Sequence, residues 1–293
     1  MSIDTVAVTG GNGRLGKHIL KEFRAHDYGT ANLARGSRRE DVSDQYITTD
    51  LTEPGDVYGS LGKTDADAVV HMGTIASPHS HPGHVTFENN VMSSYHVLEA
   101  ATDLGVDTVC LPSSINAMGA SFQKRPIEVD YVPVNEDHRL TPRDPYATAK
   151  QAIEVMADGF GRRADGPETI GSLRYPWVAY PSEIRSSFSL EDRRLESDIP
   201  DVPGGRQELF AYVLIDDAAT AARKMVEADF DGHETFWIAA DDTTMATHTD
   251  ELVAEMYPET DRRRELPGTE SLVDTTKARD VLGWRPEQSW REI

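Results

Sequence analysis

The chain has 293 residues, of which 38% are hydrophobic and 27% charged, a composition typical of globular proteins. Its 50 acidic and 29 basic residues give a net charge of −21, which argues against nucleic acid as a partner because phosphate repels such a surface. No apolar run reaches the ~18 residues of a membrane span, no basic leader precedes the first strand, and Cys110 is the single cysteine. We therefore expect a cytoplasmic protein that has no membrane segment, no intrachain disulfide and no cysteine-based zinc site.

A short apolar strand at residues 6–8 is followed directly by a glycine-rich loop and then by a helix with apolar residues at helical spacing. Strand, glycine loop and helix in this order predict a dinucleotide-binding site. The free N–H groups and partial positive charge of the helix N-terminus suit a pyrophosphate. The loop residues that we expect to contact the cofactor are Gly10, Asn12, Gly13, Arg14, Leu15 and Gly16.

The next two predicted strands, residues 30–35 and 46–49, bear on the form of the cofactor. An acidic residue at the end of the first would bind the adenosine ribose of NAD, but Ala34 and Arg35 stand there. Arginine suits a 2′-phosphate, so the sequence favours NADP over NAD, although Arg35 would equally be a solvated loop charge. The second strand ends at Asp50 and Leu51, which we expect at the adenine edge.

A fourth strand at residues 68–71 runs into Met72 and Gly73, which we place beside the cofactor. Three histidines follow within residues 79–84, but two prolines and a glycine make this an irregular loop, and we expect no metal site. A helix over residues 90–103 begins at Asn90 and is ended by Gly105.

The fifth strand, residues 107–111, leads to Ser114, and a serine at the carboxyl end of a parallel strand faces the ligand crevice. A polar, proline-broken loop spans residues 119–144 and precedes a helix. On that helix Tyr146 and Lys150 lie four residues apart and so point the same way. An ammonium beside a phenol is expected to lower its pKa, which makes Tyr146 a candidate proton donor and acceptor with Ser114 bonded to the same oxygen.

The remaining elements complete an α/β fold, a Rossmann-type doubly wound parallel sheet with a smaller C-terminal substrate-binding region. A sixth strand at residues 169–173 leads to Tyr175, whereas residues 182–207 have no clear pattern. Strands at 209–215 and 235–239 and helices from 216, at 249–256 and at 275–282 follow. We assign residues 1–174 to the dinucleotide-binding domain and residues 175–293 mainly to substrate, with the strand near 235–239 returning to the Rossmann sheet.

Taken together, the motifs resemble the NAD-dependent epimerase/dehydratase family of the extended short-chain dehydrogenase/reductase superfamily. They are the glycine loop, Asp50-Leu51, Asn90-Val91, Ser113-Ser114, Tyr146-x-x-x-Lys150, Leu173-Arg174-Tyr175, Asp216-Asp217-Ala218 and Leu282-Gly283-Trp284-x-Pro286. The resemblance implies hydride transfer at a nicotinamide, with Ser114, Tyr146 and Lys150 catalytic and with Lys150 also binding the nicotinamide ribose. It further implies cofactor contacts from Asn90 and Tyr175, and a homodimer formed through the helix near Asn90 and the Tyr146 helix.

Departures from the family patterns narrow the choice of reaction. Ile115 and Asn116 stand where sugar-nucleotide dehydratases have Asp-Glu, and Pro176-Trp177 replaces the common Phe-Asn, which puts the usual nucleotide-sugar contacts in doubt. Candidates for a diphosphate clamp are Arg185, Arg193, Arg194 and Arg206. Three readings stay open: a dehydrogenase/reductase for a small polyol, sugar or sugar acid, a nucleotide-sugar epimerase, and a non-catalytic NAD(P)-binding redox sensor. An intact Ser114, Tyr146 and Lys150 argues against the sensor.

The balance of basic residues suggests the source environment. Only seven of the 29 basic residues are lysine, and an acidic, lysine-poor surface is typical of proteins adapted to a high-salt cytoplasm. We therefore expect a halophilic protein.

Overall fold

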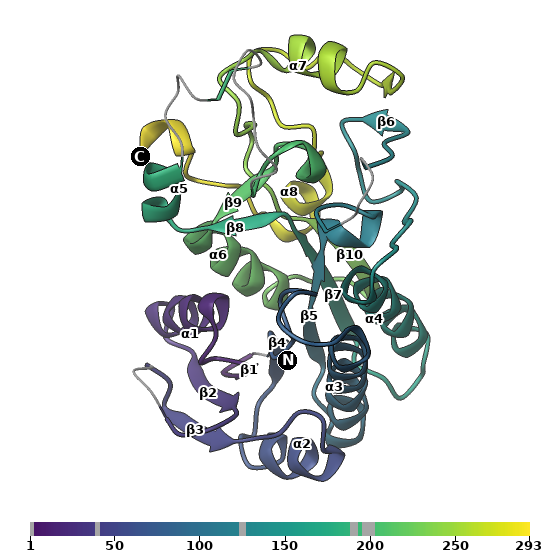
Figure 1. Ribbon diagram of the computed structural model, residues 1–293. Coiled ribbons are helices and arrows are strands. Elements are labelled where there is room, and N and C mark those ends of the chain that lie inside the picture. Colours follow the sequence, from purple (N-terminus) through teal and green to yellow (C-terminus); the bar gives the residue numbers. More distant parts are fainter. Residues whose placement is uncertain (1–2, 39–41, 123–126, 188–192, 195–202) are drawn as a thin grey trace.

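The protein is described from a computed structural model that covers residues 3–38, 42–122, 127–187, 193–194 and 203–293. Figure 1 shows a central sheet at the bottom and middle of the molecule, with a second layer of short elements above it.

The central sheet has seven parallel strands in the order β10-β7-β5-β4-β1-β2-β3. The strands are β1 (Thr5–Thr9), β2 (Gly29–Ala34), β3 (Gln45–Thr48), β4 (Ala68–His71), β5 (Thr108–Ser114), β7 (Thr169–Tyr175) and β10 (Gly232–Trp237). The strand order reverses between β1 and β4, and ligands of open α/β sheets bind at the carboxyl ends of the strands beside such a point. The fold class is thus the one that the sequence predicts.

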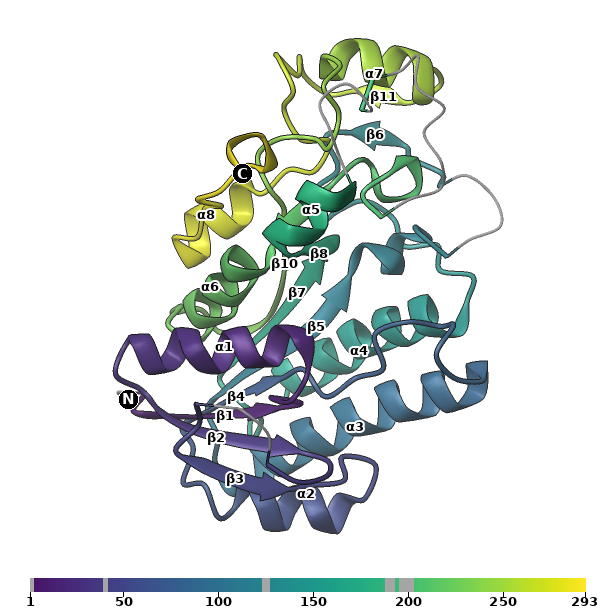
Figure 2. The ribbon, with the colours of Figure 1, turned by 60° about the vertical axis from the view of Figure 1, so that its left-hand side comes forward.

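Helices cover both faces of this sheet because alternate side chains of each buried strand point to opposite faces. Val6 and Val8 pack under α1 (Arg14–Ala25) and α6 (Ile215–Val226). Ala7 packs on the other face, which α2 (Pro54–Leu61), α3 (Gly83–Leu104) and α4 (Pro145–Gly161) cover. Figure 2 shows α1 and α6 on one side of the strands and α3 and α4 on the other.

Short elements form a cap at the carboxyl ends of the strands (Figures 1 and 2). The cap contains two parallel strand pairs, β8 (Trp177–Ala179) with β9 (Tyr212–Leu214) and β6 (Tyr131–Val132) with β11 (Asp261–Arg262). Its helices are α5 (Pro181–Ser187) and α7 (Thr249–Met256), with 3-10 turns at Ile115–Met118, Arg206–Glu208 and Trp290–Glu292. The helix α8 (Thr276–Leu282) instead buries Ala278 and Leu282 in the core that α1 and α6 form on the central sheet. A separate cluster of buried side chains, which includes Met118, Phe210 and Leu252, forms the core of this cap.

Several predicted boundaries were wrong for identifiable reasons. The helix expected from residue 90 begins at Gly83, since Pro82 stands outside the helix, just before its first residue, and so interrupts none of its backbone hydrogen bonds. The strand expected at 209–215 is confined to Tyr212–Leu214, since Leu209 and Phe210 adopt left-handed backbone angles, φ +57° and +52°, that no strand allows. The stretch expected to be an unbroken loop at 119–144 contains β6. Within the described ranges, every helix falls short of the length and apolar character that a membrane crossing requires.

Candidate active site

The glycine loop between β1 and α1 packs against the loop that follows β4. Gly10 has φ +67°, and a Cβ there would lie 2.7 Å from the Cα of Gly73. A Cβ at Gly16 would lie 2.4 Å from the carbonyl oxygen of Gly10, inside van der Waals contact. The first turn of α1 has no acidic side chain, so its free N–H groups remain suited to an anion. This glycine cradle fits the pyrophosphate of a dinucleotide.

A chain of buried hydrogen bonds holds the loop after β4 in place. The Thr9 hydroxyl accepts hydrogen bonds from the backbone N–H groups of Met72 and Gly73, each at 3.1 Å, and lies 2.7 Å from Nδ1 of His71. His71 Nε2 lies 3.1 Å from Ser94 Oγ, and burial lowers the pKa of His71 to about 3, so its ring is neutral. The Asn90 side chain clasps the same loop, accepting from the N–H of Ile75 at 2.7 Å and donating to its carbonyl at 2.9 Å.

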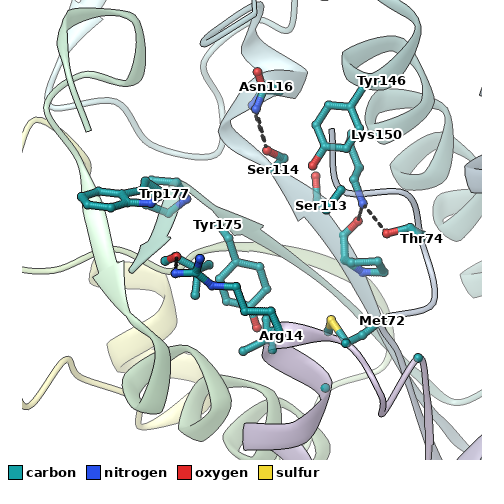
Figure 3. A pocket seen from close by; sticks show the side chains of 18 of the residues that line it. Arg14, Met72, Thr74, Ser113, Ser114, Asn116, Tyr146, Lys150, Tyr175 and Trp177 are labelled. Atoms are coloured by element: carbon teal, nitrogen blue, oxygen red, sulfur yellow. Dashed lines mark hydrogen bonds between the residues drawn. The ribbon is translucent and has the colours of Figure 1, made fainter. Parts of the chain in front are cut away.

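Ser114, Tyr146 and Lys150 meet at the carboxyl end of β5 (Figure 3). Asp144 caps α4 by accepting from the N–H of Ala147 at 2.9 Å, which places Tyr146 in the first turn of the helix. The Lys150 ammonium donates to the carbonyl of Pro112 at 2.7 Å and to the Thr74 hydroxyl at 3.3 Å. It lies 5.5 Å from the centre of the Tyr146 ring.

Burial dominates the electrostatics of this set. Tyr146 and Lys150 are only 7% and 2% exposed. Burial raises the pKa of Tyr146 to about 12, and the hydrogen bond with Ser114 offsets only part of that rise. The expected lowering of this pKa by Lys150 is therefore not what the structure shows. Burial lowers the pKa of Lys150 to about 7, against the opposing charge of Glu154. The protein thus holds Tyr146 as a protonated phenol, a proton donor.

Asn116 orients the serine, a role that the sequence reasoning missed. Ser114 Oγ accepts hydrogen bonds from the backbone N–H of Asn116 at 3.2 Å and from its Nδ2 at 3.1 Å. With both acceptor positions of Ser114 used, its hydroxyl proton is left to donate, and in this structure its partner is the Tyr146 oxygen. The sequence does contain a signal for this role, because Asn116 lies only two residues beyond the carboxyl end of β5.

The catalytic candidates and the glycine loop line one cavity of about 400 Å³. The predicted residues in its wall are Gly10, Gly13, Arg14, Leu15, Gly16, Met72, Ser114, Tyr146, Lys150 and Tyr175. Residues of the wall that were not predicted as site residues include Thr74, Ser113, Asn116, Phe122, Trp177 and Glu208. Phe122 and Glu208 lie on segments without sequence periodicity, so no local pattern pointed to them.

Arg14 connects the glycine loop to the cap. Its guanidinium pairs with the Glu183 carboxylate of α5 and donates to the carbonyl of Val178 at 2.8 Å. It also stacks on the ring of Tyr180, 4.3 Å from the centroid. These contacts join, at the cavity wall, segments that are 164 and 169 residues apart in the chain.

The other predicted cofactor residues, Asn12, Arg35, Asp50, Leu51, Gly73 and Asn90, do not line the cavity. Asn12 donates to the Tyr46 hydroxyl at 3.0 Å, and Asp50 accepts from the N–H and hydroxyl of Thr52 at 3.0 and 2.7 Å. Leu51 is buried against Gly73, where a Cβ would meet its side chain at 2.1 Å. Arg35 is exposed just beyond β2.

The proposed diphosphate clamp is not assembled at the cavity by its described members. Arg193 is buried and donates to the carbonyls of Thr244 and Gly204 at 3.0 and 3.1 Å, and Arg206 donates to the carbonyl of Met256 at 2.6 Å. Arg185 and Arg194 are exposed and outside the cavity wall. Among the described residues, no group of three or more His, Cys, Asp or Glu side chains is arranged to hold a metal ion.

A doubly wound sheet with a glycine cradle at its switch point defines a dinucleotide-binding α/β protein. Residues 6–239 match the NAD dependent epimerase/dehydratase family, and the chain belongs to that family. It is thereby an NAD(P)-dependent enzyme of the dehydrogenase/reductase or epimerase type.

Individual relatives are similar over nearly the whole chain. A UDP-glucose 4-epimerase of Rhizobium leguminosarum bv. trifolii is 25% identical over 100% of this chain and 96% of its own. The crystal structure of the Thermotoga maritima UDP-glucose 4-epimerase with UDP-glucose has a TM-score of 0.71 at 20% identity, covering 98% of this chain and 95% of that one. A mutated uronate dehydrogenase has a TM-score of 0.67 at 17% identity, covering 99% and 85%. Both structures are similar to this chain in fold.

Proposed function

We propose that the protein transfers a hydride between a nicotinamide cofactor and a hydroxyl or carbonyl carbon of a small sugar-like molecule, with Ser114, Tyr146 and Lys150 as its catalytic set. The observation that carries this proposal is the convergence of these three side chains with the glycine cradle on one cavity. A cavity that joins a phosphate cradle to a tunable proton donor is suited to this reaction.

Each residue has a defined part. The cofactor, when bound, supplies or accepts the hydride. Ser114, whose acceptor positions are filled by Asn116, would donate to the oxygen of a bound substrate. Tyr146 gives that oxygen its proton in reduction, and the Tyr146 phenolate takes the proton in oxidation. Lys150, anchored on Pro112 and Thr74, would donate its remaining N–H to the ribose of a bound nicotinamide cofactor.

The arginines favour a small polyol, sugar or sugar acid as the substrate. Arg193 and Arg206 are bonded to backbone carbonyls, which leaves them poorly placed to clamp a diphosphate. We propose further that residues 1–174 bind the dinucleotide and that residues 175–293 mainly select the substrate.

A second candidate, nucleotide-sugar epimerase, is supported by the relatives. The Rhizobium protein, which is similar over the whole chain, is a UDP-glucose 4-epimerase. In such a reaction the hydride leaves and returns, so the same three residues would serve.

A substrate panel distinguishes the two candidates. Purified protein in molar KCl with NAD⁺ or NADP⁺ is given free sugars, polyols and uronates, and reduced cofactor is followed by absorbance. The same protein is then given UDP-glucose, and UDP-galactose is sought by chromatography. Net cofactor reduction with a free sugar supports the dehydrogenase, whereas interconversion of the UDP-sugars without net reduction supports the epimerase. No turnover in either arm would contradict both.

We propose NADP as the preferred form of the cofactor. The residue at the end of β2 is Ala34, so no carboxylate stands there to bind a ribose 2′-hydroxyl, and the exposed Arg35 follows it. The name of the family and an NAD-bound structure of similar fold point instead to NAD. Comparing the affinities for NADPH and NADH therefore discriminates between the two forms of the cofactor.

We also propose a homodimer formed through α3 and α4. These neighbouring helices carry large apolar side chains at the surface, Phe87 and Met92 on α3 and Val155, 61% exposed, on α4. Exposed apolar side chains on adjacent helices are typical of subunit contacts. Light scattering after gel filtration should give twice the chain mass of 32.4 kDa, and Val155→Glu should give a monomer. A wild-type monomer would contradict this proposal.

A further inference from the structure

The helix α4 carries a third functional side chain on the face of Tyr146 and Lys150. Glu154 follows Lys150 at the same spacing of four residues, so the three lie along one face of the helix. Glu154 is 6% exposed, and it does not line the cavity. A buried carboxylate requires partners, and those partners indicate its role.

The carboxylate of Glu154 is bonded to two strands at once. Arg174 of β7 donates to it from Nε at 2.9 Å and from Nη2 at 2.8 Å, and Ser113 of β5 donates from Oγ at 2.5 Å. Ser113 and Arg174 are directly paired in the β5–β7 register. The next pair in that register is Ser114 and Tyr175, both of which line the cavity. Glu154 thus fixes the helix of Tyr146 against the two strands that end at the site.

The negative charge of Glu154 also offsets part of the effect that desolvation has on the pKa of Lys150. The hydrogen-bond partners of the Lys150 ammonium, Pro112 and Thr74, are neutral. Within the part of the chain that the structure describes, His71, which is held neutral, and Tyr146, which is held protonated, are the other titratable groups shown to interact with it. The pKa of Lys150 is lowered to about 7 by burial, and the Glu154 carboxylate is the group that raises it. Arg174, which is bound to Glu154, is the cation beyond it.

We propose that Glu154 is a positioning residue of the active site: its carboxylate holds α4, β5 and β7 in register and supplies the fixed negative charge that lets Lys150 work as an ammonium. Glu154 transfers no proton and touches no substrate in this role. The inference rests on the proposed function of Lys150, but its test requires no substrate.

The test is the pH dependence of cofactor binding, measured by tryptophan quenching with NADH and with NADPH from about pH 5.5 to 9 in molar KCl. Lysine is charged below its pKa, so cofactor affinity should fall as the pH rises through the Lys150 pKa. We call this fall in affinity the step, and Lys150→Met should abolish it. In Glu154→Gln the step should move to lower pH by roughly one unit or more, because an opposite charge is lost. Glu154→Asp should restore most of the wild-type position.

Two further variants separate charge from packing. Ser113→Ala removes one hydrogen bond to Glu154 and leaves the charge, so its step should stay at the wild-type pH. Since Glu154→Gln leaves the Arg174 guanidinium buried without its partner, the double variant Glu154→Gln/Arg174→Met removes both charges and keeps the experiment valid if the single variant does not fold. Its step should lie below that of the wild type.

A step that stays in place in Glu154→Gln or in the double variant would overturn the proposal. So would an equal displacement in Ser113→Ala, which would assign the effect to packing, or a wild-type profile without a step that depends on Lys150. Retained turnover in Tyr146→Phe would instead contradict the proposed function and leave this titration unaffected.

Discussion

At the scale of single residues, burial decides the protonation of the catalytic candidates. Spacing alone places Tyr146 and Lys150 one helical turn apart and predicts a lowered pKa for the phenol. The structure raises the pKa of Tyr146 to about 12 and lowers that of Lys150 to about 7, because both side chains are withdrawn from water. Desolvation disfavours the charged form of each group, and its size is set by tertiary packing that a motif does not encode.

The preference for NADP depends on one exposed side chain. Arg35→Ala should weaken NADPH binding by about 10- to 150-fold, which corresponds to a charge-assisted hydrogen bond of ~1.5–3 kcal/mol, and should change NADH binding far less. Fluorescence titration with both cofactors measures this difference. Arg24→Ala is the control, because it removes the same charge from α1, where Arg24 is exposed and paired with Asp44. Equal losses of NADPH and NADH affinity in Arg35→Ala would remove the preference.

At the scale of elements, the two loops that form the cradle depend on the absence of side chains. Gly10→Ala would place a Cβ 2.7 Å from the Gly73 backbone at φ +67°, so we expect a lower melting temperature and at least tenfold weaker cofactor binding. Gly59→Ala on α2 is the control, since a Cβ there meets nothing within 4 Å. The control should bind cofactor normally and gain about 0.5–1 kcal/mol of stability. Normal cofactor binding by Gly10→Ala would contradict the cradle.

The same scale shows which parts of the site were predictable. The strands of the sheet could be read because parallel strands buried on both faces are continuous apolar runs, as in Val6–Val8 and Val69–Val70. The glycine loop could be read because its order of elements is specific. Two-residue strands such as β6 and β11 have no periodicity to read. Trp177 and Glu208 reach the cavity through long-range packing, which single-sequence patterns do not report.

At the scale of the whole molecule, a net charge of −21 sets the response to salt. Many of the 29 basic side chains lie in exposed ion pairs such as Arg139 with Asp130 and Arg264 with Glu270, so the excess of carboxylates is left to repel itself. Dense counter-ions screen that repulsion, since the Debye length falls to about 3 Å at 1 M salt. We expect the melting temperature to rise from low-millimolar to molar KCl by calorimetry. A melting temperature that is flat or falls over this range would contradict the expected adaptation to high salt.

The role of Tyr146 in proton transfer is tested most directly by measuring both the cofactor affinity and the turnover of Tyr146→Phe. The change removes one hydroxyl from a ring that otherwise keeps its packing, so the dissociation constant for the cofactor should stay within about twofold while turnover falls by ~10²–10⁴. Full turnover in the phenylalanine variant, with its fold confirmed by an unchanged melting curve, would show that Tyr146 is not the group that moves the proton.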